Sequence, residues 1–321
     1  MRGWHLALRP DRPSSRPPPK RRASLRSHRA VIPRAKLRAR EPPSLPLLPL
    51  RATPTAHPSH MLDLFHPQGV CAMIFSTMPH PRLVSFIIPA WNEESFVATT
   101  IEAVKAAALD LAEPSEIIVA DDASTDRTAE IARQHGARVV TVHHRQIAAT
   151  RNAGAREAQG DLLIFIDADT IVTPEAVCAA VKAVRLGAIG GGCAIRYGGR
   201  LPLYLRVFVP IEVWFCRATG IAFGCFLFCT RAAFDAVGGF DTGLYATEEV
   251  PMSMALHRQG RFVILRECII TSGRKLRTHS TREWFGQIYR ITFARRRYIR
   301  SRAGMGLWYD DRRPDPEMKK L

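Results

Sequence analysis

Between residues 83 and 184, short continuous apolar runs alternate with segments in which apolar residues recur at helical spacing. Each run is too short for a helix, and the first is ended by Pro89, as expected of strands that are buried on both faces. The runs predict four strands, at residues 83–90, 115–122, 137–142 and 161–169.

The segments between these runs predict helices. In the first segment Val97, Ile101, Val104 and Ala108 share one helical face, and Asn92 is the expected N-cap. Further helices are predicted at residues 124–136, which Gly136 ends, at residues 146–160, and at residues 173–184, where Thr173 caps and Pro174 opens the helix.

This alternation predicts an α/β fold. Strands and helices joined by short links form right-handed βαβ units, whose parallel strands are covered by helices. We therefore expect a Rossmann-like, mostly parallel sheet with helices on both faces.

Residues 1–82 have a different composition. They are rich in Pro and Arg, hold 15 Lys and Arg but 3 Asp and Glu, and account for most of the net charge of +17. Too few apolar residues occur to offset the entropy of ordering, so we predict a disordered segment without a secretory signal. A basic arm that binds RNA or acidic lipid stays open, as does a true start at Met61, Met73 or Met78.

The seven cysteines show no C-x-x-C spacing and no zinc pattern with histidine, which predicts a reducing, cytoplasmic compartment. No run reaches the roughly 18 to 20 apolar residues of a membrane span. The most apolar segment, residues 201–229, is interrupted by Arg206, Glu212 and Arg217. We expect it to pack as a helix followed by a strand, with contact to a membrane surface as the open alternative.

Acidic residues follow three of the first four predicted strands. They are Glu93, the pair Asp121 and Asp122, and the pair Asp167 and Asp169. The carboxyl ends of parallel strands meet at one edge, so these carboxylates should crowd together and repel one another. We expect a bound cation, rather than internal lysines and arginines, to stabilise them.

Asp167 and Asp169 are two residues apart. If the strand continues to Asp169, both side chains point to the same side and suit Mg²⁺ or Mn²⁺ carrying a diphosphate. The alternative is that the two aspartates only cap the following turn.

Five stretches of the chain occur in a specific order: "FIIPAWNEE", "IIVADDASTDRT", "ATRNAGAREAQGDLLIFIDADT", "AVGGFDTGLYATEEV" and "LHRQGR". Together they resemble a family 2 glycosyltransferase of the GT-A fold, over about residues 83–270. The resemblance implies a nucleotide-sugar donor and metal-assisted, inverting transfer. It divides the chain into a disordered segment (1–82), a GT-A domain (83–275) and a basic helical C-terminal extension (276–321).

The same resemblance assigns donor-site roles. It places Pro89, Ala90, Asn92 and Glu93 in the first nucleotide-binding loop. It places Asp121 and Asp122 at ribose and base, with Asp122 as the base contact. It places Arg151 and Asn152 near the diphosphate, and Asp167, Ala168 and Asp169 in the metal-binding D-x-D motif. Asp167 and Asp169 are the implied ligands, Asp169 the more direct. Charge-assisted hydrogen bonds suit these pairings, although an ordinary exposed helix position stays open for Arg151.

Thr247, Glu248 and Glu249 resemble the family's acidic acceptor-site motif, which usually ends in Glu-Asp. The resemblance makes Glu249 the general base, with Glu248 beside it. The alternative is an acid that stabilises the start of a helix.

The function that we expect is hexosyl transfer from a UDP- or GDP-sugar to a saccharide or lipid-linked acceptor, with Mn²⁺ or Mg²⁺, in the synthesis of cell-envelope polysaccharide. Residues 282–302 mix aromatic side chains with arginines. For this basic helix, contact with the inner face of a membrane and packing on the catalytic domain both stay open. Gln287 and Arg290 have the spacing of the Q-x-x-R-W motif of processive synthases, but Ile291 replaces the tryptophan, so we do not expect processivity.

Three other classes fit less well. A nucleotidyltransferase should carry a Gly-rich basic loop after the first strand, where this chain has "WNEE", and a dehydrogenase should carry G-x-G-x-x-G there. A nucleic-acid-binding protein would depend on the first 82 residues and on salt. We expect no specific nucleic-acid partner.

Overall fold

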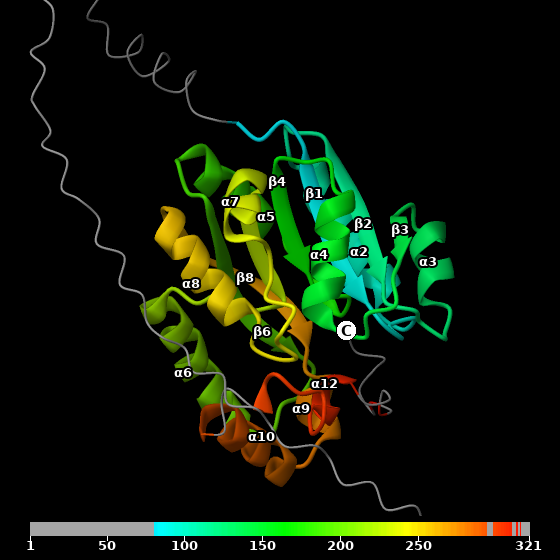
Figure 1. Cartoon of the computed structure of the whole chain (residues 1–321), viewed down its shortest axis with the longest axis vertical. Coiled ribbons are helices and arrows are strands. Elements are labelled where there is room, and N and C mark those ends of the chain that lie inside the picture. The colour runs from blue at the N-terminus through cyan, green and yellow to red at the C-terminus, as the bar shows by residue number, and fades with distance from the viewer. Residues whose placement is uncertain (1–79, 294–297, 310–312, 314, 316–321) are drawn as a thin grey trace, which may run out of the picture. The chain divides into compact units, whose positions relative to one another are not determined.

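The computed structural model describes residues 80–293, 298–309, 313 and 315. In this part of the chain, eight strands form a sheet with the order β3-β2-β1-β4-β7-β6-β8-β5 (Figure 1). The strands are β1 (Val84–Ala90), β2 (Ser115–Asp121), β3 (Arg138–Thr141), β4 (Leu162–Ile166), β5 (Thr170–Ile171), β6 (Gly190–Gly198), β7 (Phe226–Thr230) and β8 (Phe262–Ser272).

Helices connect most of these strands. They are α2 (Val97–Leu109), α3 (Thr128–Gln134), α4 (Ile147–Glu157), α5 (Pro174–Arg185), α6 (Leu203–Thr219), α7 (Arg231–Val237), α8 (Glu249–Gln259), α9 (Arg274–Thr278), α10 (Thr281–Phe293) and α12 (Gly306–Tyr309). Among the helices that the structure describes, none combines the length and apolar character that a bilayer crossing requires.

The sheet is mixed but mostly parallel. β1 pairs in parallel with β2 and β4, β2 with β3, and β6 with β8. β7 runs antiparallel to both of its neighbours, β4 and β6, and β5 runs antiparallel to β8. The expected α/β fold is therefore confirmed, with two strands reversed.

The core lies in two layers, one on each face of the sheet. In β4, Leu162, Ile164 and Ile166 pack in the layer that contains α2 and α5, whereas Leu163 and Phe165 pack with α4, α7 and α8. Side chains alternate between the faces of a strand, so a strand covered on both sides is apolar at every position. This is why the continuous apolar runs predicted strands correctly.

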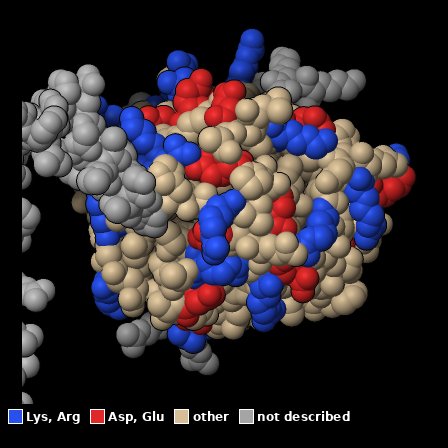
Figure 2. Space-filling view, turned by 90° about the horizontal axis from the view of Figure 1, so that it is seen from above, with Lys and Arg blue, Asp and Glu red and all other residues tan. Residues whose placement is uncertain are grey.

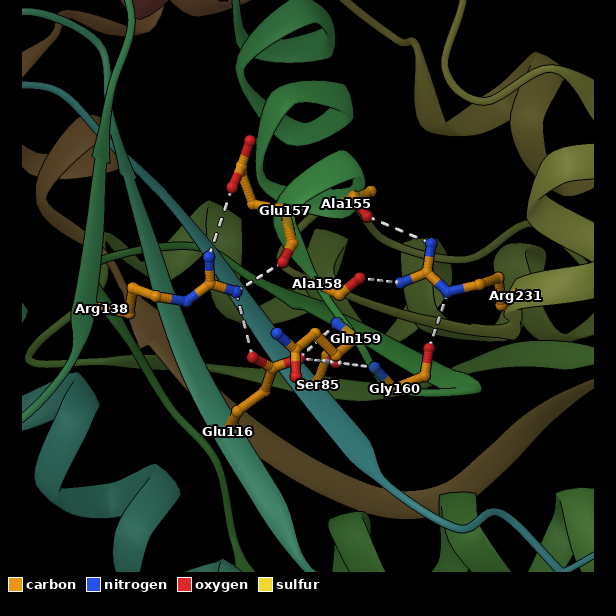
Figure 3. Close-up of polar contacts among 9 residues, drawn as sticks. All are labelled: Ser85, Glu116, Arg138, Ala155, Glu157, Ala158, Gln159, Gly160 and Arg231. Carbon is orange, nitrogen blue, oxygen red and sulfur yellow. Dashed lines mark hydrogen bonds and ion pairs between the residues drawn. The ribbon is translucent and has the colours of Figure 1, made fainter.

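A network of polar contacts holds the C-terminal end of α4 to the sheet (Figure 3). Arg231 donates to the carbonyl oxygens of Ala155, Ala158 and Gly160, and Arg138 donates to the carbonyl oxygen of Glu157. Arginines at the negative end of a helix dipole stabilise it. These contacts fix the position of α4. The first turns of α4, which begin at Ile147, lie at the opposite end of the sheet.

Two local predictions are wrong. Asn92 does not cap α2, which begins at Val97 after Phe96; instead, Asn92 has φ 51° and accepts a hydrogen bond of 2.8 Å from the backbone N–H of Thr125. The fourth strand ends at Ile166 rather than at residue 169. By contrast, Thr173 caps α5 as expected, accepting from the N–H of Ala176 at 3.2 Å.

The charge pattern of the described surface is mixed on the face that Figure 2 shows, where blue basic and red acidic side chains lie interspersed. The expectations for residues 1–79, which concern disorder, a basic arm and an alternative start, lie outside the described residues. The expected boundary at residue 275 falls inside α9, so the helix joins the two expected parts without a break.

Candidate active site

Two cavities lie at the edge of the sheet where the parallel strands end. The first, of about 80 Å³, is lined by the loop after β1 together with residues of five other segments; its lining includes Pro89, Ala90, Trp91, Glu93, Asp122, Arg145, Arg274 and Tyr309. The second, of about 250 Å³, is lined by Arg151, Tyr197, Glu212, Gly224, Glu248, Glu249 and Trp284 among others. Asp167, Asp169, Lys275 and Trp308 line both cavities, so the two cavities meet at the D-x-D sequence.

The backbone at this edge adopts unusual conformations. Among the described residues, four that are not glycine have positive φ: Asn92, Ala123, Arg145 and Thr247. All four lie in loops that follow β1, β2 or β3 or precede α8. For a β-branched residue such as Thr247, at φ 60°, this conformation is strained, and such strain clusters at functional sites.

Asp167 and Asp169 lie in a turn directly after β4. The N–H of Thr170 donates to the carbonyl oxygen of Asp167 at 3.1 Å, which closes the turn. From the sequence, both side chains were expected on one side on the condition that the strand continues to Asp169. The strand ends at Ile166 instead, so strand alternation does not orient them. The turn nevertheless presents both carboxylates to the two cavities.

Arg151 of α4 is the central cation of the site and is only 1% exposed. Its guanidinium donates to Asp167 Oδ1 at 2.8 Å, to Glu248 Oε1 at 2.5 Å and to the carbonyl oxygen of Gly224 at 2.8 Å. The interpretation of Arg151 as an ordinary exposed residue is therefore wrong. It joins the D-x-D turn to the acceptor-site motif.

Arg274, at the start of α9, is a second internal cation. Its guanidinium lies 2.5 Å from Glu93 Oε1 and 3.1 Å from Asp169 Oδ2, and it stacks over the ring of Phe96 at 4.9 Å. It thus links the loop after β1 to the D-x-D turn.

Internal arginines contact these carboxylates, which the sequence did not lead us to expect. Buried carboxylates need a positive partner, and Arg151 and Arg274 supply it. Each arginine engages one oxygen of its aspartate. The other oxygens of Asp167 and Asp169 make no hydrogen bond to the described part of the chain.

Asp121 and Asp122 differ in their surroundings. Asp122 lines the first cavity, and its oxygens accept from the N–H groups of residues 144–146 and from the hydroxyl of Thr150 at 2.6 to 3.0 Å. It thereby shapes the loop that carries Arg145. Asp121 Oδ1 is buried and has no hydrogen-bond partner among the described residues.

Asn152 lines neither cavity. Its amide exchanges two hydrogen bonds of 2.9 Å with the backbone of Phe240. Gly239, at φ 77°, allows this approach, because a Cβ there would lie 2.8 Å from Asn152 Oδ1. These contacts hold the "GGFD" turn against α4.

Glu248 and Glu249 lie where α8 begins. Glu248 is buried and paired with Arg151. Glu249 is half-buried and lines the second cavity. Burial raises the pKa of Glu249 to about 8, and the negative charges of Glu248 and Asp167 act in the same direction. Glu249 is also the first residue of α8, which is the position that the alternative interpretation, an acid at the start of a helix, gives it.

This geometry agrees with a sequence comparison. Residues 85–228 match the sequence model of Glycosyl transferase family 2. This region belongs to glycosyl transferase family 2. The family 2 region contains the loop after β1, both acidic strand ends and the D-x-D turn.

Curated proteins similar to this chain include transferases named for undecaprenyl phosphate. The undecaprenyl-phosphate 4-deoxy-4-formamido-L-arabinose transferase of Pseudomonas aeruginosa (strain LESB58) is 34% identical over 163 residues, 46% of this chain and 47% of the relative. The Serratia proteamaculans protein of the same name is 36% identical over 114 residues, 33% of this chain and 35% of the relative. The chain spans about half the length of the curated relatives it matches.

Solved structures show the same fold. The mannosyltransferase PcManGT from Pyrobaculum calidifontis, in complex with GDP-Man and Mn²⁺, superposes with a TM-score of 0.53 at 20% identity, over 78% of this chain and 73% of that chain. Mannosyl-3-phosphoglycerate synthase from Rubrobacter xylanophilus superposes with a TM-score of 0.50 at 18% identity, over 68% of this chain and 74% of that chain. The expected GT-A fold is confirmed.

Several residues that line the two cavities were not identified from the sequence. Trp91 lies inside the loop that the sequence singled out, and the guanidinium of Arg145 stacks over its ring at 3.5 Å. Tyr309 and Trp308 reach the cavities from the far C-terminal segment. For Trp91 the signal was present, because an aromatic side chain in a nucleotide loop can stack on a base; for the other two no motif marks the position.

The Q-x-x-R spacing does not extend the site. Gln287 is buried, lines neither cavity and accepts from the hydroxyl of Tyr298 at 2.9 Å. In the described residues its surroundings are those of a side chain that ties α10 to the segment after it.

Proposed function

We propose that this chain is a hexosyltransferase that moves a sugar from a nucleotide-sugar donor to a lipid-linked phosphate or saccharide acceptor, with inversion at the anomeric carbon. The observation that carries the proposal is the meeting of two cavities at Asp167 and Asp169. One cavity is formed by the loops after β1, β2 and β3, and the other contains the acidic start of α8. A donor and an acceptor bound in them would face each other at the D-x-D turn.

The first cavity suits a nucleoside diphosphate. The ring of Trp91, beside Arg145, offers a stacking surface, and Tyr309 lines the same cavity. Asp121 Oδ1, at the end of β2, is buried and has no hydrogen-bond partner among the described residues. Buried polar atoms without partners are rare, and the N–H or O–H donors of a base or ribose would satisfy this oxygen. Asp121 lines neither cavity, but this unpaired oxygen supports the role expected of it beside Asp122, as a base or ribose contact.

The D-x-D turn suits a divalent cation. Among the described residues, no cluster of three or more His, Cys, Asp or Glu would hold a metal ion alone. Mg²⁺ and Mn²⁺, however, bind through one or two carboxylates and complete their shells with phosphate oxygens and water. Asp167 and Asp169 each have one carboxylate oxygen without an arginine partner and would hold it. The metal, when bound, offsets the charge that develops on the departing diphosphate.

The second cavity suits the reacting end of the acceptor. Glu249 removes the proton from the acceptor hydroxyl or phosphate, and the deprotonated oxygen forms its bond to the anomeric carbon as the bond to the diphosphate breaks. Arg151 holds Glu248 and Asp167 in place on either side of this reaction. Lys275, which lines both cavities, adds positive charge beside the phosphates.

A lipid-linked acceptor is favoured by the similarity to transferases of undecaprenyl phosphate. Such an acceptor stays in the bilayer, so we place the protein at the cytoplasmic face of a membrane, in the synthesis of cell-envelope polysaccharide. The six cysteines in the described part of the chain are free thiols, as in a reducing compartment.

A panel of nucleotides tests the donor site. UDP, GDP, CMP and dTDP are added to the protein with and without Mn²⁺, and thermal unfolding is followed. We expect one of the four nucleotides to raise the melting temperature more than the others, and to do so far more with Mn²⁺ than without it, because the metal would bridge the diphosphate to the protein. A ligand at 100 times its Kd adds about 2.7 kcal/mol to the free energy of unfolding. In Asp169→Asn the extra shift that Mn²⁺ produces should vanish. An unchanged shift would remove Asp169 from the metal site.

The rate of transfer should rise with pH. Because the pKa of Glu249 is raised to about 8, most of its carboxyl groups carry a proton at pH 7 and cannot accept another. We expect kcat/KM to increase roughly tenfold per pH unit below pH 8 and to level off above it. A profile that is flat between pH 6 and 9, measured at saturating Mn²⁺, would argue against Glu249 as the base.

A further inference from the structure

α6 carries an exposed apolar face. Phe208, Ile211, Trp214 and Phe215 point to solvent, with Trp214 67% exposed. Their spacing puts them on one side of the helix, while Leu205 and Cys216 on the other side are buried against the domain. Large apolar side chains at this density mark an interaction surface rather than ordinary scatter.

α10 adds to this surface. Tyr289 and Phe293 are exposed one turn apart, and their rings contact each other at 4.8 Å between centroids. Glu212 of α6 and Trp284 of α10 both line the second cavity, so both helices contribute to its wall. In Figure 1 the two helices lie at the same end of the molecule as α9 and α12.

Basic side chains accompany the apolar ones. Arg206 and Arg217 are exposed on α6, as are Arg282 and Arg290 on α10. Aromatic rings beside arginines are the composition of a helix that lies in the interface of an anionic bilayer, where rings enter the headgroup region and each basic residue near the surface attracts acidic lipid.

We propose that the exposed faces of α6 and α10 dock on an anionic phospholipid bilayer and bring the second cavity to the membrane surface. The inference rests on the proposed function, because the docking would serve to deliver a lipid-linked acceptor to Glu249. The occupant is a bilayer rather than a second copy of the chain, because arginines on both helices would repel their counterparts across a symmetric interface, whereas anionic headgroups match them.

Sedimentation with vesicles tests this docking. The full chain is mixed with vesicles of phosphatidylcholine containing phosphatidylglycerol, or of phosphatidylcholine alone, at several salt concentrations. We expect the protein to pellet with the anionic vesicles. The double variant Trp214→Ser with Phe215→Ser should bind them at least about tenfold more weakly, since two rings no longer enter the interface. The variant should keep the wild-type melting temperature, because both side chains are exposed.

Leu109 provides a matched control. It is 84% exposed at the end of α2, away from both cavities, so Leu109→Ser should bind vesicles as the wild type does. Equal binding by the wild type and the double variant would overturn the proposal, and so would a wild type that stays in the supernatant. Self-association that the double variant abolishes, without any vesicle binding, would assign the surface to a second copy instead.

Two acceptors separate this proposal from the proposed function. Transfer is measured to a vesicle-embedded polyprenyl phosphate and to a water-soluble short-chain analogue. We expect the double variant to lose at least about tenfold with the embedded acceptor and nothing with the soluble one. Vesicle binding that the double variant weakens, in a protein that transfers to neither acceptor, would contradict the proposed function and leave the docking surface standing.

Discussion

Replacing Glu249 by glutamine should lower the rate of sugar transfer by roughly 10²- to 10⁴-fold, the usual contribution of a general base. Glutamine keeps the size and shape of the side chain in the second cavity but cannot accept a proton. Binding of the nucleotide should be nearly unchanged, because Glu249 does not line the first cavity. The measurement is kcat for transfer, set beside the nucleotide-induced shift in melting temperature.

The control is Glu249→Asp, which creates the Glu-Asp ending that this motif usually has in the family. A carboxylate one methylene shorter still accepts a proton, so this variant should keep transfer within about tenfold of the wild type. If Glu249→Gln lost nucleotide binding as well, the side chain would be structural. If Glu249→Gln transferred sugar at the wild-type rate, a group other than Glu249 would accept the proton of the acceptor.

Replacing Arg151 by methionine should have the largest effect on stability. The buried guanidinium meets Asp167, Glu248 and the carbonyl oxygen of Gly224, and methionine leaves both carboxylates without a partner. Breaking a buried ion pair by removing one member costs about 3 to 5 kcal/mol. For a domain of this size the melting temperature should fall by roughly 6 to 20 °C, which differential scanning calorimetry would measure.

Arg127→Met is the matched comparison. Arg127 and Glu130 form an exposed pair at 3.0 Å on the surface of the protein, and solvent screening leaves such pairs little effect on stability. The melting temperature of this variant should therefore stay close to that of the wild type. An Arg151→Met protein as stable as Arg127→Met would mean that Asp167 and Glu248 find other partners or water.

The strands and helices up to α5 could be predicted because their signals are local. Continuous apolar runs marked the buried strands, and Thr173 with Pro174 marked the start of α5. The errors were local as well: Asn92 has the chemistry of a cap, but its side chain bonds Thr125 in the next loop. The sequence does not show whether the Asn92 side chain bonds the start of the next helix or the backbone of a separate loop.

The acidic edge could be predicted, but its arginines could not. The rule that parallel strands end together placed Glu93 near Asp169. The partner of both, Arg274, follows β8 and lies 181 residues from Glu93 in the chain. No periodicity or motif connects positions so far apart, and the same holds for Tyr309. The roles of the individual site residues stay predictions until the variants are made.

The reversal of β7 has a consequence for how this molecule could diversify. Because β7 runs against β4 and β6, it separates an earlier half, β1 to β4, from a later half, β6 and β8; the short β5 pairs with β8 at the far edge. The loops after β1, β2 and β3 come from the earlier half, while α6, α8 and α10 come from the later one, which also supplies Arg274, Lys275, Trp308 and Tyr309 to the first cavity. Substitutions on α6 and α10, which do not line the first cavity, could therefore retarget the molecule to a new recipient without altering nucleotide choice, provided that the contact between Arg151 and Glu248 survives as the coupling between the halves.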